Sequence, residues 1–442
     1  MGNSNIATKL ILIAKKSREA PDLKFTALLH HINLEHLLVC YQDLKRGKAP
    51  GIDGKTKESY TDQEIKEILL QTADKIQAKK YRPQPVKRVY ISKEKSTKQR
   101  PLGLPTVVDK IVQLALKNIL ERIFEPNFLD CSYGYRPNRD AHQALKALNH
   151  LIMQKKVNWI IDADIEGFFD HLDHYWMMEC LSQRIGDPRF KSLIFKFLKS
   201  GVMQEGIYEP TEQGTSQGGV ISPILANIYL HYVLDLWFEK VAKKELNGEV
   251  QLIRYADDFI IGLQYKDQAE KLLEMLKQRL AKFGLSISEE KTRIIEFGRF
   301  ARENSQKRGE NKPKTFEFLG LTHYCSLTRD GRFKLGVKTA CQRMKRSLKS
   351  INNWLKRTRN LLKQEEIWKQ LAIKLVGHYN YYGVSGNFES IKEVYYQTIF
   401  LTYKWLNRRS WKRSFNWESF NQYLNFHPLP KPKLTFQIYN TW

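Results

Sequence analysis

Two adjacent carboxylates interrupt an apolar stretch near the middle of the chain. Residues 252–263 read Leu-Ile-Arg-Tyr-Ala-Asp-Asp-Phe-Ile-Ile-Gly-Leu, so two β-prone runs flank a tip formed by Tyr255, Ala256, Asp257 and Asp258. Neighbouring carboxylates between apolar strands repel each other and are costly to desolvate unless a cation compensates them. A hard divalent ion such as Mg²⁺ would do so through carboxylate oxygens. An ordinary Asp-rich hairpin turn explains the tip equally well.

A second pair of carboxylates lies upstream. Trp159 to Ile161 predicts a buried strand, and Gly167 marks the exit from it. Asp162 and Asp164 are two residues apart, so they share one face of that strand. A carboxylate at a strand end, close to a hairpin that carries two more, is the arrangement that a two-metal centre requires. Asp170 is interpreted as the N-cap of the next helix.

Three further segments contain residues suited to binding. Lys93 and Arg100 bracket a charged segment predicted to be a β-hairpin tip, which could hold a triphosphate or be a solvated turn. The glycine-rich loop 214–223 precedes a helix predicted from residue 224, and it permits close backbone approach to another chain or is simply flexible. Segment 132–138 is either a template-facing loop or a packed corner.

Composition indicates a polyanionic partner. The 442 residues include 73 Lys and Arg against 47 Asp and Glu, a formal net charge of +26. Such an excess favours nucleic acid or an anionic membrane surface. The N-terminal apolar run 6–14 is too short to span a bilayer, so we expect no membrane partner. The five cysteines are dispersed, which predicts neither a disulfide framework nor a zinc module. We therefore expect a cytoplasmic protein, with association with a bacterial nucleoid left open.

The C-terminal third carries most of the positive charge. Residues 299–442 contain 28 Lys and Arg against 9 Asp and Glu, so 19 of the 26 excess charges lie there. Residues 299–314 are polar and predicted to be a linker or a long exposed loop. Beyond them, Met344, Leu348, Ile351 and Leu355 recur at helical spacing, with cations between them and aromatic residues downstream. Interleaved cations and aromatics favour a surface that binds nucleic acid.

The order of these segments along the chain is more specific than any one of them. The sequence resembles reverse transcriptases, and more narrowly the group II intron-encoded reverse transcriptase/maturases. The resemblance rests on Asp164-Ile-Glu-Gly-Phe-Phe-Asp170, Gly214-Thr-Ser-Gln-Gly-Gly-Val-Ile-Ser-Pro-Ile-Leu-Ala-Asn227, Tyr255-Ala-Asp-Asp258 and Phe318-Leu-Gly320.

The resemblance implies an α+β right-hand polymerase. Fingers and a palm with an antiparallel sheet would be followed by an α-helical thumb, the maturase domain. We expect an N-terminal extension and the start of the fingers in residues 1–80, fingers and palm in 81–330, and the thumb in 331–442. Many relatives also end in a DNA-binding segment and an endonuclease, which the sequence up to Trp442 is expected to lack because no Cys pair follows Cys341.

The resemblance also implies roles for individual residues. Two Mg²⁺ ions, or Mn²⁺ as a substitute, would be bound by Asp164, Asp257 and the carbonyl of Ile165. The residues implied at the active site are Asp164, Asp257, Asp258 and Lys291 as catalytic groups, with Lys291 protonating pyrophosphate, and Lys93, Arg100, Ile165, Phe169 and Gln217 around the deoxynucleotide. Whether Asp258 binds metal directly or supports Asp257 stays open.

The expected activity is RNA-directed DNA synthesis. The protein would extend a DNA or RNA primer with dNTPs on an RNA template, and would bind its intron RNA to assist splicing and mobility. A bulky ring at Phe169 would clash with a ribose 2′-hydroxyl, which, together with Tyr-Ala-Asp-Asp in place of Gly-Asp-Asp, disfavours an RNA-dependent RNA polymerase. Two alternatives stay open: an RNA-binding splicing cofactor with a vestigial polymerase, and a reverse transcriptase relative recruited to host defence or repair.

Overall fold

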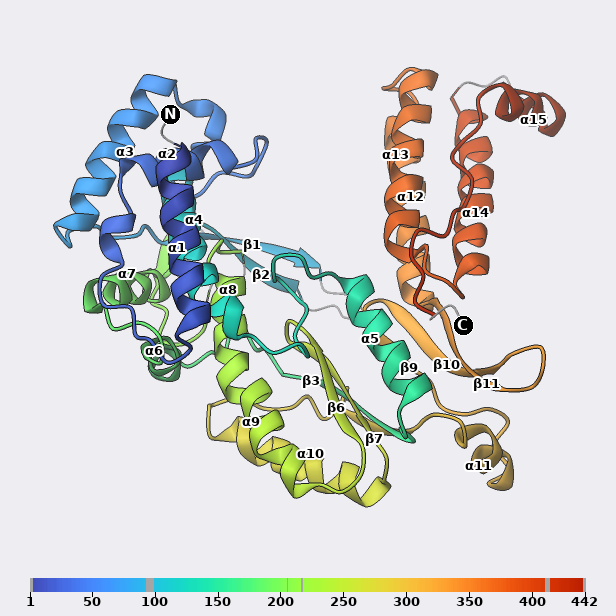
Figure 1. The fold of residues 1–442 in the computed structure, drawn as a ribbon. Helices are drawn as coiled ribbons and strands as arrows, with labels where there is room; N and C mark the ends of the chain where they lie inside the picture. Colours follow the sequence, from blue (N-terminus) through green and yellow to red (C-terminus); the bar gives the residue numbers. More distant parts are fainter. Residues whose placement is uncertain (1–2, 93–98, 205, 216–217, 410–413, 440–442) are drawn as a thin grey trace.

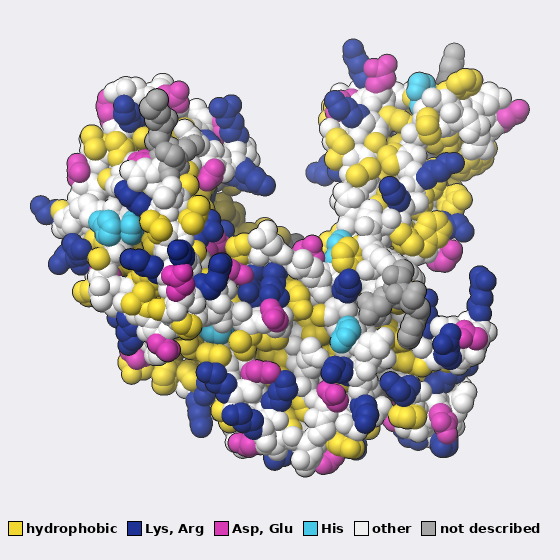
Figure 2. Space-filling model, viewed as in Figure 1, with side chains coloured by type: hydrophobic (Ala, Val, Ile, Leu, Met, Phe, Trp, Pro, Cys, Tyr) yellow, Lys and Arg dark blue, Asp and Glu magenta, His cyan; other side chains and the backbone are white. Residues whose placement is uncertain are grey.

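The chain is organised as two helical lobes joined by a central sheet (Figure 1). The computed structural model describes residues 3–92, 99–204, 206–215, 218–409 and 414–439. Figure 2 shows that the surface is hollowed between the two lobes, above the sheet, and that Lys and Arg side chains occur on both of them. The expected α+β class is confirmed.

The central sheet is antiparallel, with strand order β6-β7-β3-β8. Alternate residues of its strands face opposite sides: Ile161 and Ile261 pack with α10, and Ile160 and Ile260 pack with α5. Because both faces are covered, consecutive residues in the middle of β3 and β7 are apolar. The elements are β3 (Trp159–Asp164), β6 (Val250–Tyr255), β7 (Asp258–Leu263), β8 (Arg293–Glu296), α5 (Ala141–Gln154) and α10 (Lys266–Ala281).

The N-terminal lobe combines helices with a small mixed sheet. In this sheet β1 pairs antiparallel with β2 and parallel with β4, and β4 continues into the β4–β5 hairpin. The elements are α1 (Asn3–Glu19), α2 (Leu34–Asp43), α3 (Asp62–Gln77), β1 (Val86–Ser92), β2 (Gln99–Leu104), α4 (Val107–Phe124), α6 (His174–Ser182), α7 (Pro188–Leu198), β4 (Val202–Gln204) and β5 (Ile207–Glu209).

A long interrupted helix connects this lobe to the sheet. The helix α8 (Ser222–Leu230) runs into a π-helical segment, His231–Asp235, and then into α9 (Leu236–Lys240). Pro223 stands at the second position of α8, where its missing N–H costs nothing. The π-helical segment is almost wholly buried, and π-bulges inside α-helices are frequent at functional sites.

The C-terminal lobe is a helical bundle attached through a third sheet. Its contact with that sheet is polar at one point, where Asn387 Oδ1 accepts a hydrogen bond from Thr339 N at 2.7 Å. The elements are β9 (Phe316–Phe318), β10 (Leu321–Leu327), β11 (Phe333–Thr339), α12 (Cys341–Thr358), α13 (Gln364–Tyr382), α14 (Phe388–Leu406) and α15 (Trp417–Phe426). The expected boundary at residue 330 stays a prediction, and the β10–β11 hairpin spans it.

Two expectations from the sequence are wrong. Residues 299–314 are no continuous linker, because α11 (Ala301–Lys307) forms there and buries Ala301 and Ser305. Asp170 caps no helix: α6 begins later, and its N-cap is Asp173, which accepts a hydrogen bond from Trp176 N at 2.9 Å. Across the described ranges, no helix is both long and apolar enough to cross a membrane.

A buried histidine links the third sheet to acid stability. His323 lies in β10, is 1% exposed and stacks on Phe316 with 4.9 Å between ring centroids. Burial lowers the pKa of His323 to about 4. Since the unfolded chain then binds a proton that the folded chain resists, this histidine destabilises the fold as pH falls below about 6.5.

We predict that His323→Phe makes the fold less sensitive to acid. Between pH 7 and pH 5 the wild-type chain should lose roughly 2 kcal/mol of unfolding free energy through His323 alone. The loss in the variant should be smaller by this amount. Urea unfolding at both pH values measures this. His427→Gln, at an exposed histidine, is the control and should behave like the wild type. An equal loss in the His323 variant would contradict the assignment.

Candidate active site

The two carboxylate segments meet at one end of the central sheet. Asp164, the last residue of β3, is the direct partner of Asp258, the first residue of β7. Asp257 stands between β6 and β7 in a two-residue turn, and the preceding Ala256 has φ +59°. Positive φ in such a turn matches the right-handed twist of the strands that it joins. The hairpin predicted from the sequence is confirmed, and its tip lies beside Asp164.

Two cations partly neutralise the strand carboxylates. Lys291 Nζ donates to Asp164 Oδ2 at 2.5 Å, and both side chains are partly exposed. Arg293 donates to Asp162 Oδ2 at 3.0 Å across the β3–β8 pair. Burial nevertheless raises the pKa of Asp162, because the cation of Arg293 only partly offsets desolvation and the charge of Asp164 raises it further. The site therefore keeps an excess of negative charge.

Asp258 experiences this excess most strongly. Burial, followed by the charges of Asp162, Asp257 and Asp164, raises its pKa to about 8. Within the described residues, no three His, Cys, Asp or Glu side chains are gathered as a formed metal cage, and Asp164 is turned to Lys291. The donor set still fits a hard divalent cation, since such an ion prefers carboxylate oxygens and would relieve their repulsion.

The backbone beyond β3 leaves a carbonyl available. Ile165 forms an isolated antiparallel bridge with Ile287. The two hydrogen bonds of this bridge run from Ser288 N to Asp164 O at 2.9 Å and from Glu166 N to Ser286 O at 2.9 Å. The carbonyl of Ile165 is thus used by neither bond, and it belongs to the residue that directly follows Asp164.

A buried ion pair supports the turn that carries Asp257. Arg254 is fully buried and donates to both carboxylate oxygens of Asp235, at 2.7 and 2.6 Å. The same guanidinium donates to the carbonyl of Ala256 at 2.9 Å and to Asn227 Oδ1 at 3.1 Å. Burial would lower the pKa of Arg254, but the charge and hydrogen bonds of Asp235 raise it above the usual value. Arg254 therefore stays charged directly beneath the turn.

Segment 132–138 supplies the other side of this support. Tyr133 N donates to the Arg254 carbonyl at 2.9 Å, and Asn227 Nδ2 donates to the Gly134 carbonyl at 2.8 Å. A Cβ on Gly134 would lie 2.4 Å from Ala256 N, so only glycine allows this approach. The first part of the segment is accordingly a packed corner, whereas Tyr135 is exposed.

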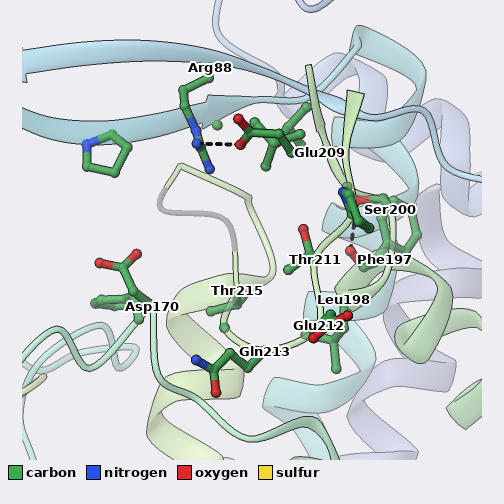
Figure 3. Close-up of a pocket in the computed structure, with 18 of the residues that line it drawn as sticks. Arg88, Asp170, Phe197, Leu198, Ser200, Glu209, Thr211, Glu212, Gln213 and Thr215 are labelled. Atoms are coloured by element: carbon green, nitrogen blue, oxygen red, sulfur yellow. Dashed lines mark hydrogen bonds and ion pairs between the residues drawn. The ribbon is translucent and has the colours of Figure 1, made fainter. Parts of the chain in front are cut away.

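Phe169 lies against the glycine-rich loop. Its ring is buried and packs edge-on against Phe168 at 5.3 Å, and its carbonyl accepts a hydrogen bond from Thr215 N at 2.8 Å. It lines a cavity of about 820 Å³ that reaches to β1 and β2. Figure 3 shows Arg88, paired with Glu209, and Asp170 on opposite sides of this cavity. The volume is in the range of small-molecule sites.

Three residues expected around the nucleotide have no side-chain description. Lys93 and Gln217 lie outside the described residues. Arg100 is described as backbone only, in β2, where it pairs with Ile91 of β1. The structure therefore brings together Asp164, Asp257, Asp258 and Lys291 with Ile165, places Phe169 beside the glycine-rich loop, and leaves the expected triphosphate cations untested.

A match to a family model identifies the family of the chain. Residues 91–323 match the model described as "Reverse transcriptase (RNA-dependent DNA polymerase)", which is more than half of the chain. The chain belongs to the reverse transcriptase family. Its N-terminal lobe, central sheet and C-terminal lobe correspond to the fingers, the palm and the helical thumb of the right-hand fold.

The curated relatives of the chain include intron-encoded proteins. The chain is 35% identical over 306 residues to the group II intron-encoded protein LtrA of Lactococcus lactis subsp. cremoris, covering 65% of this chain and 50% of LtrA. It is 31% identical over 280 residues to protein YkfC of Escherichia coli, covering 57% of this chain and 73% of that protein. A 91 kDa protein in the cob intron of Schizosaccharomyces pombe is 28% identical over 347 residues, 66% of this chain and 42% of that protein. The chain thus spans about half the length of LtrA.

Sequence reasoning missed the charged residues that surround the reverse transcriptase carboxylates. Arg254 precedes the Tyr-Ala-Asp-Asp tip and is a cation inside an apolar strand, which is a signal that a buried acid is needed. Its partner Asp235 could not be chosen from the sequence, because the π-helical segment changes the helix register at that point. Asp162 was identified from the sequence, but its pairing with Arg293 becomes visible only through the β3–β8 register.

We predict that Arg254 positions the catalytic turn as well as stabilising it. Arg254→Ala should cost about 3–5 kcal/mol of unfolding free energy, because Asp235 is left charged and buried. Replacing both partners, as Arg254→Met with Asp235→Leu, should restore most of that stability. The double variant should nevertheless lose about 100-fold in primer extension rate, because the Ala256 carbonyl loses its donor and Asp257 shifts.

The concentration of Mg²⁺ needed for half-maximal rate distinguishes positioning from folding. This Mg²⁺ concentration should be higher for the double variant than for the wild type. Arg254→Lys, which keeps the charge, should give a value between the two. A double variant that is both stable and fully active, with an unchanged Mg²⁺ requirement, would show that the pair is only structural.

Proposed function

We propose that this protein is an RNA-directed DNA polymerase. The observation that carries the proposal is the pairing of Asp164 with Asp258, which places strand-end carboxylates beside Asp257 in a chain of the reverse transcriptase family. The substrates would be dNTPs, an RNA template and a DNA or RNA primer. The excess of Lys and Arg over Asp and Glu supports a nucleic-acid partner.

The proposed site holds two Mg²⁺ ions through Asp164, Asp257 and the Ile165 carbonyl, and Mn²⁺ is expected to substitute. When bound, such ions stabilise charge on the attacking and leaving oxygens of phosphoryl transfer. Burial and the neighbouring carboxylate charges, which together raise the pKa of Asp258, support this cation requirement. We assign Asp258 the role of contributing negative charge to the site.

The remaining residues act on the nucleotide. The primer 3′-oxygen bonds to the α-phosphorus of the dNTP, the bond from that phosphorus to the bridging oxygen breaks, and the hydroxyl proton passes to solvent. Lys291, which lies beside Asp164, gives a proton to the departing pyrophosphate. Lys93 and Arg100 hold the triphosphate, Gln217 contacts the incoming nucleotide or the template base, and Phe169 excludes a 2′-hydroxyl.

A second role in splicing is favoured by the thumb surface and by the relatives. The helix α12 buries Ile351 and Leu355 and exposes Lys345, Lys349 and Lys356. Cationic side chains of this kind bind RNA phosphates. Because proteins related to this chain are named as intron-encoded proteins and as a nuclear intron maturase, we propose that it binds its intron RNA and assists splicing and mobility.

We predict that Asp257→Ala abolishes primer extension on an RNA template with dNTPs and Mg²⁺. Loss of a carboxylate that binds the catalytic ions should reduce the rate to background, and wild-type protein treated with a chelator should behave likewise. Asp267→Ala, at the start of α10 and away from the site, is the control. Splicing of the intron RNA should survive Asp257→Ala. An active Asp257→Ala enzyme would disprove the proposed metal site.

We predict that Phe169→Val relaxes sugar selection. Discrimination against ribonucleotides in single-nucleotide incorporation should fall by roughly 10- to 100-fold, because the smaller side chain leaves room for the 2′-hydroxyl. Phe168→Val is the matched control: the neighbouring ring is 2% exposed and packs toward Tyr229, so its loss should lower stability without changing sugar selection. Equal discrimination in wild type and Phe169→Val would refute the steric role.

A further inference from the structure

A second cavity, of about 800 Å³, lies at the opposite end of the palm from the carboxylates. It is formed between the C-terminal end of α5 and the tip of the β10–β11 hairpin, elements that lie side by side in Figure 1. The chain leaves α5 and enters β3 at Trp159, whereas Asp164 is at the far end of that strand. The length of β3 alone separates the two sites by about 17 Å.

A buried amide lines this cavity. Asn149 is only 4% exposed, and its Oδ1 atom has no hydrogen-bond partner in the described structure. An unpaired buried amide oxygen is unfavourable, and a polar group of this kind beside a cavity commonly has its partner in a bound molecule. The missing partner is a hydrogen-bond donor, and an N–H group would serve.

Aromatic and cationic side chains complete the lining. Phe333 and Tyr439 provide rings, and Tyr439 is held by its hydroxyl, which donates to the Leu335 carbonyl at 3.1 Å. Lys334 Nζ lies 4.3 Å from the centroid of the Tyr439 ring. Arg332 is paired with Asp330 at 2.5 Å, but Lys334 and Arg299 form no ion pair with an acidic side chain among the described residues. Both remain able to meet an anion.

We propose that this cavity binds one unpaired adenosine nucleotide of an RNA strand. An Asn amide matches adenine, since its oxygen accepts from N6–H and its nitrogen donates to N7. Unpaired RNA bases stack on aromatic side chains while cations contact the flanking phosphates. Phe333 and Tyr439 would therefore stack on the base, and Arg299 and Lys334 would contact the phosphates. This binding site is separate from the proposed polymerase active site, and binding of a nucleotide there requires no polymerase activity.

Photo-crosslinking tests the site locally, because other surfaces of the full chain also bind RNA. The purified protein is irradiated with the single-stranded oligoribonucleotides A12 or U12, each ending in one 4-thiouridine so that both carry the same photoreactive group, and crosslinked peptides are identified by mass spectrometry. Peptides containing Phe333 or Tyr439 should crosslink to A12 about tenfold more than to U12. No crosslink in these peptides, or equal crosslinking of the two RNAs, would overturn the proposal.

Asn149→Leu is the decisive variant, because Leu keeps the shape of Asn and removes the hydrogen-bonding amide. It should lose the preference for A12 in these peptides while its melting temperature stays the same or rises. Asn118→Leu, which removes a partly buried amide in the fingers, should change neither crosslink. If Asn149→Leu fails to fold, Arg299→Glu at an exposed position should reduce A12 crosslinking in the same peptides. Unchanged crosslinks in the folded variants would refute the site, whatever the outcome of primer extension.

Discussion

Four carboxylates crowd one end of the palm sheet, and much of the surrounding structure balances their charge. Three cations approach them, from β6, from the first residue of β8 and from the turn before β8, and the three pairs differ in burial. The pairs are Lys291 with Asp164, Arg293 with Asp162, and Arg254 with Asp235 beneath Asp257. Desolvation and repulsion still raise the pKa of Asp258 to about 8. A site with this residual charge favours a cation over any neutral or anionic ligand.

The hairpin turn keeps its conformation because the buried polar groups beneath it are hydrogen-bonded. A two-residue turn with Ala256 at positive φ is strained for a residue with a side chain, and its carbonyl would be unsatisfied without Arg254. Arg254 in turn needs Asp235, which the π-helical segment delivers, and Asn227, which also holds Gly134 against the turn. The strain at the turn is therefore stabilised by contacts from three separate segments.

The sequence was informative wherever the chemistry is local. Alternation of residues predicted the hairpin, and spacing placed Asp162 and Asp164 on one face. Prediction from the sequence failed where long-range packing determines the local structure. Asp170 and Asp173 are both suitable N-caps, and only the path of the turn after β3 selects Asp173. The polar α11 helix buries Ala301 and Ser305 and is bonded to β8 through Asn304 and Arg308, which both donate to Glu296, and no periodicity in that segment reveals these contacts.

The burial of the three pairs matches the roles proposed for them. Arg254 and Asp235 have no exposed side-chain surface, so breaking them is costly and the turn stays fixed. Arg293 and Asp162 are intermediate, with the acid 14% exposed. Lys291 is 66% exposed and Asp164 31%, and an exposed pair of this kind contributes little to stability. Lys291 can therefore leave Asp164 at small cost when a stronger cation takes the carboxylate. This weak pairing is compatible with the proposed role of Lys291 as proton donor, because its ammonium group can move without a large loss of stability.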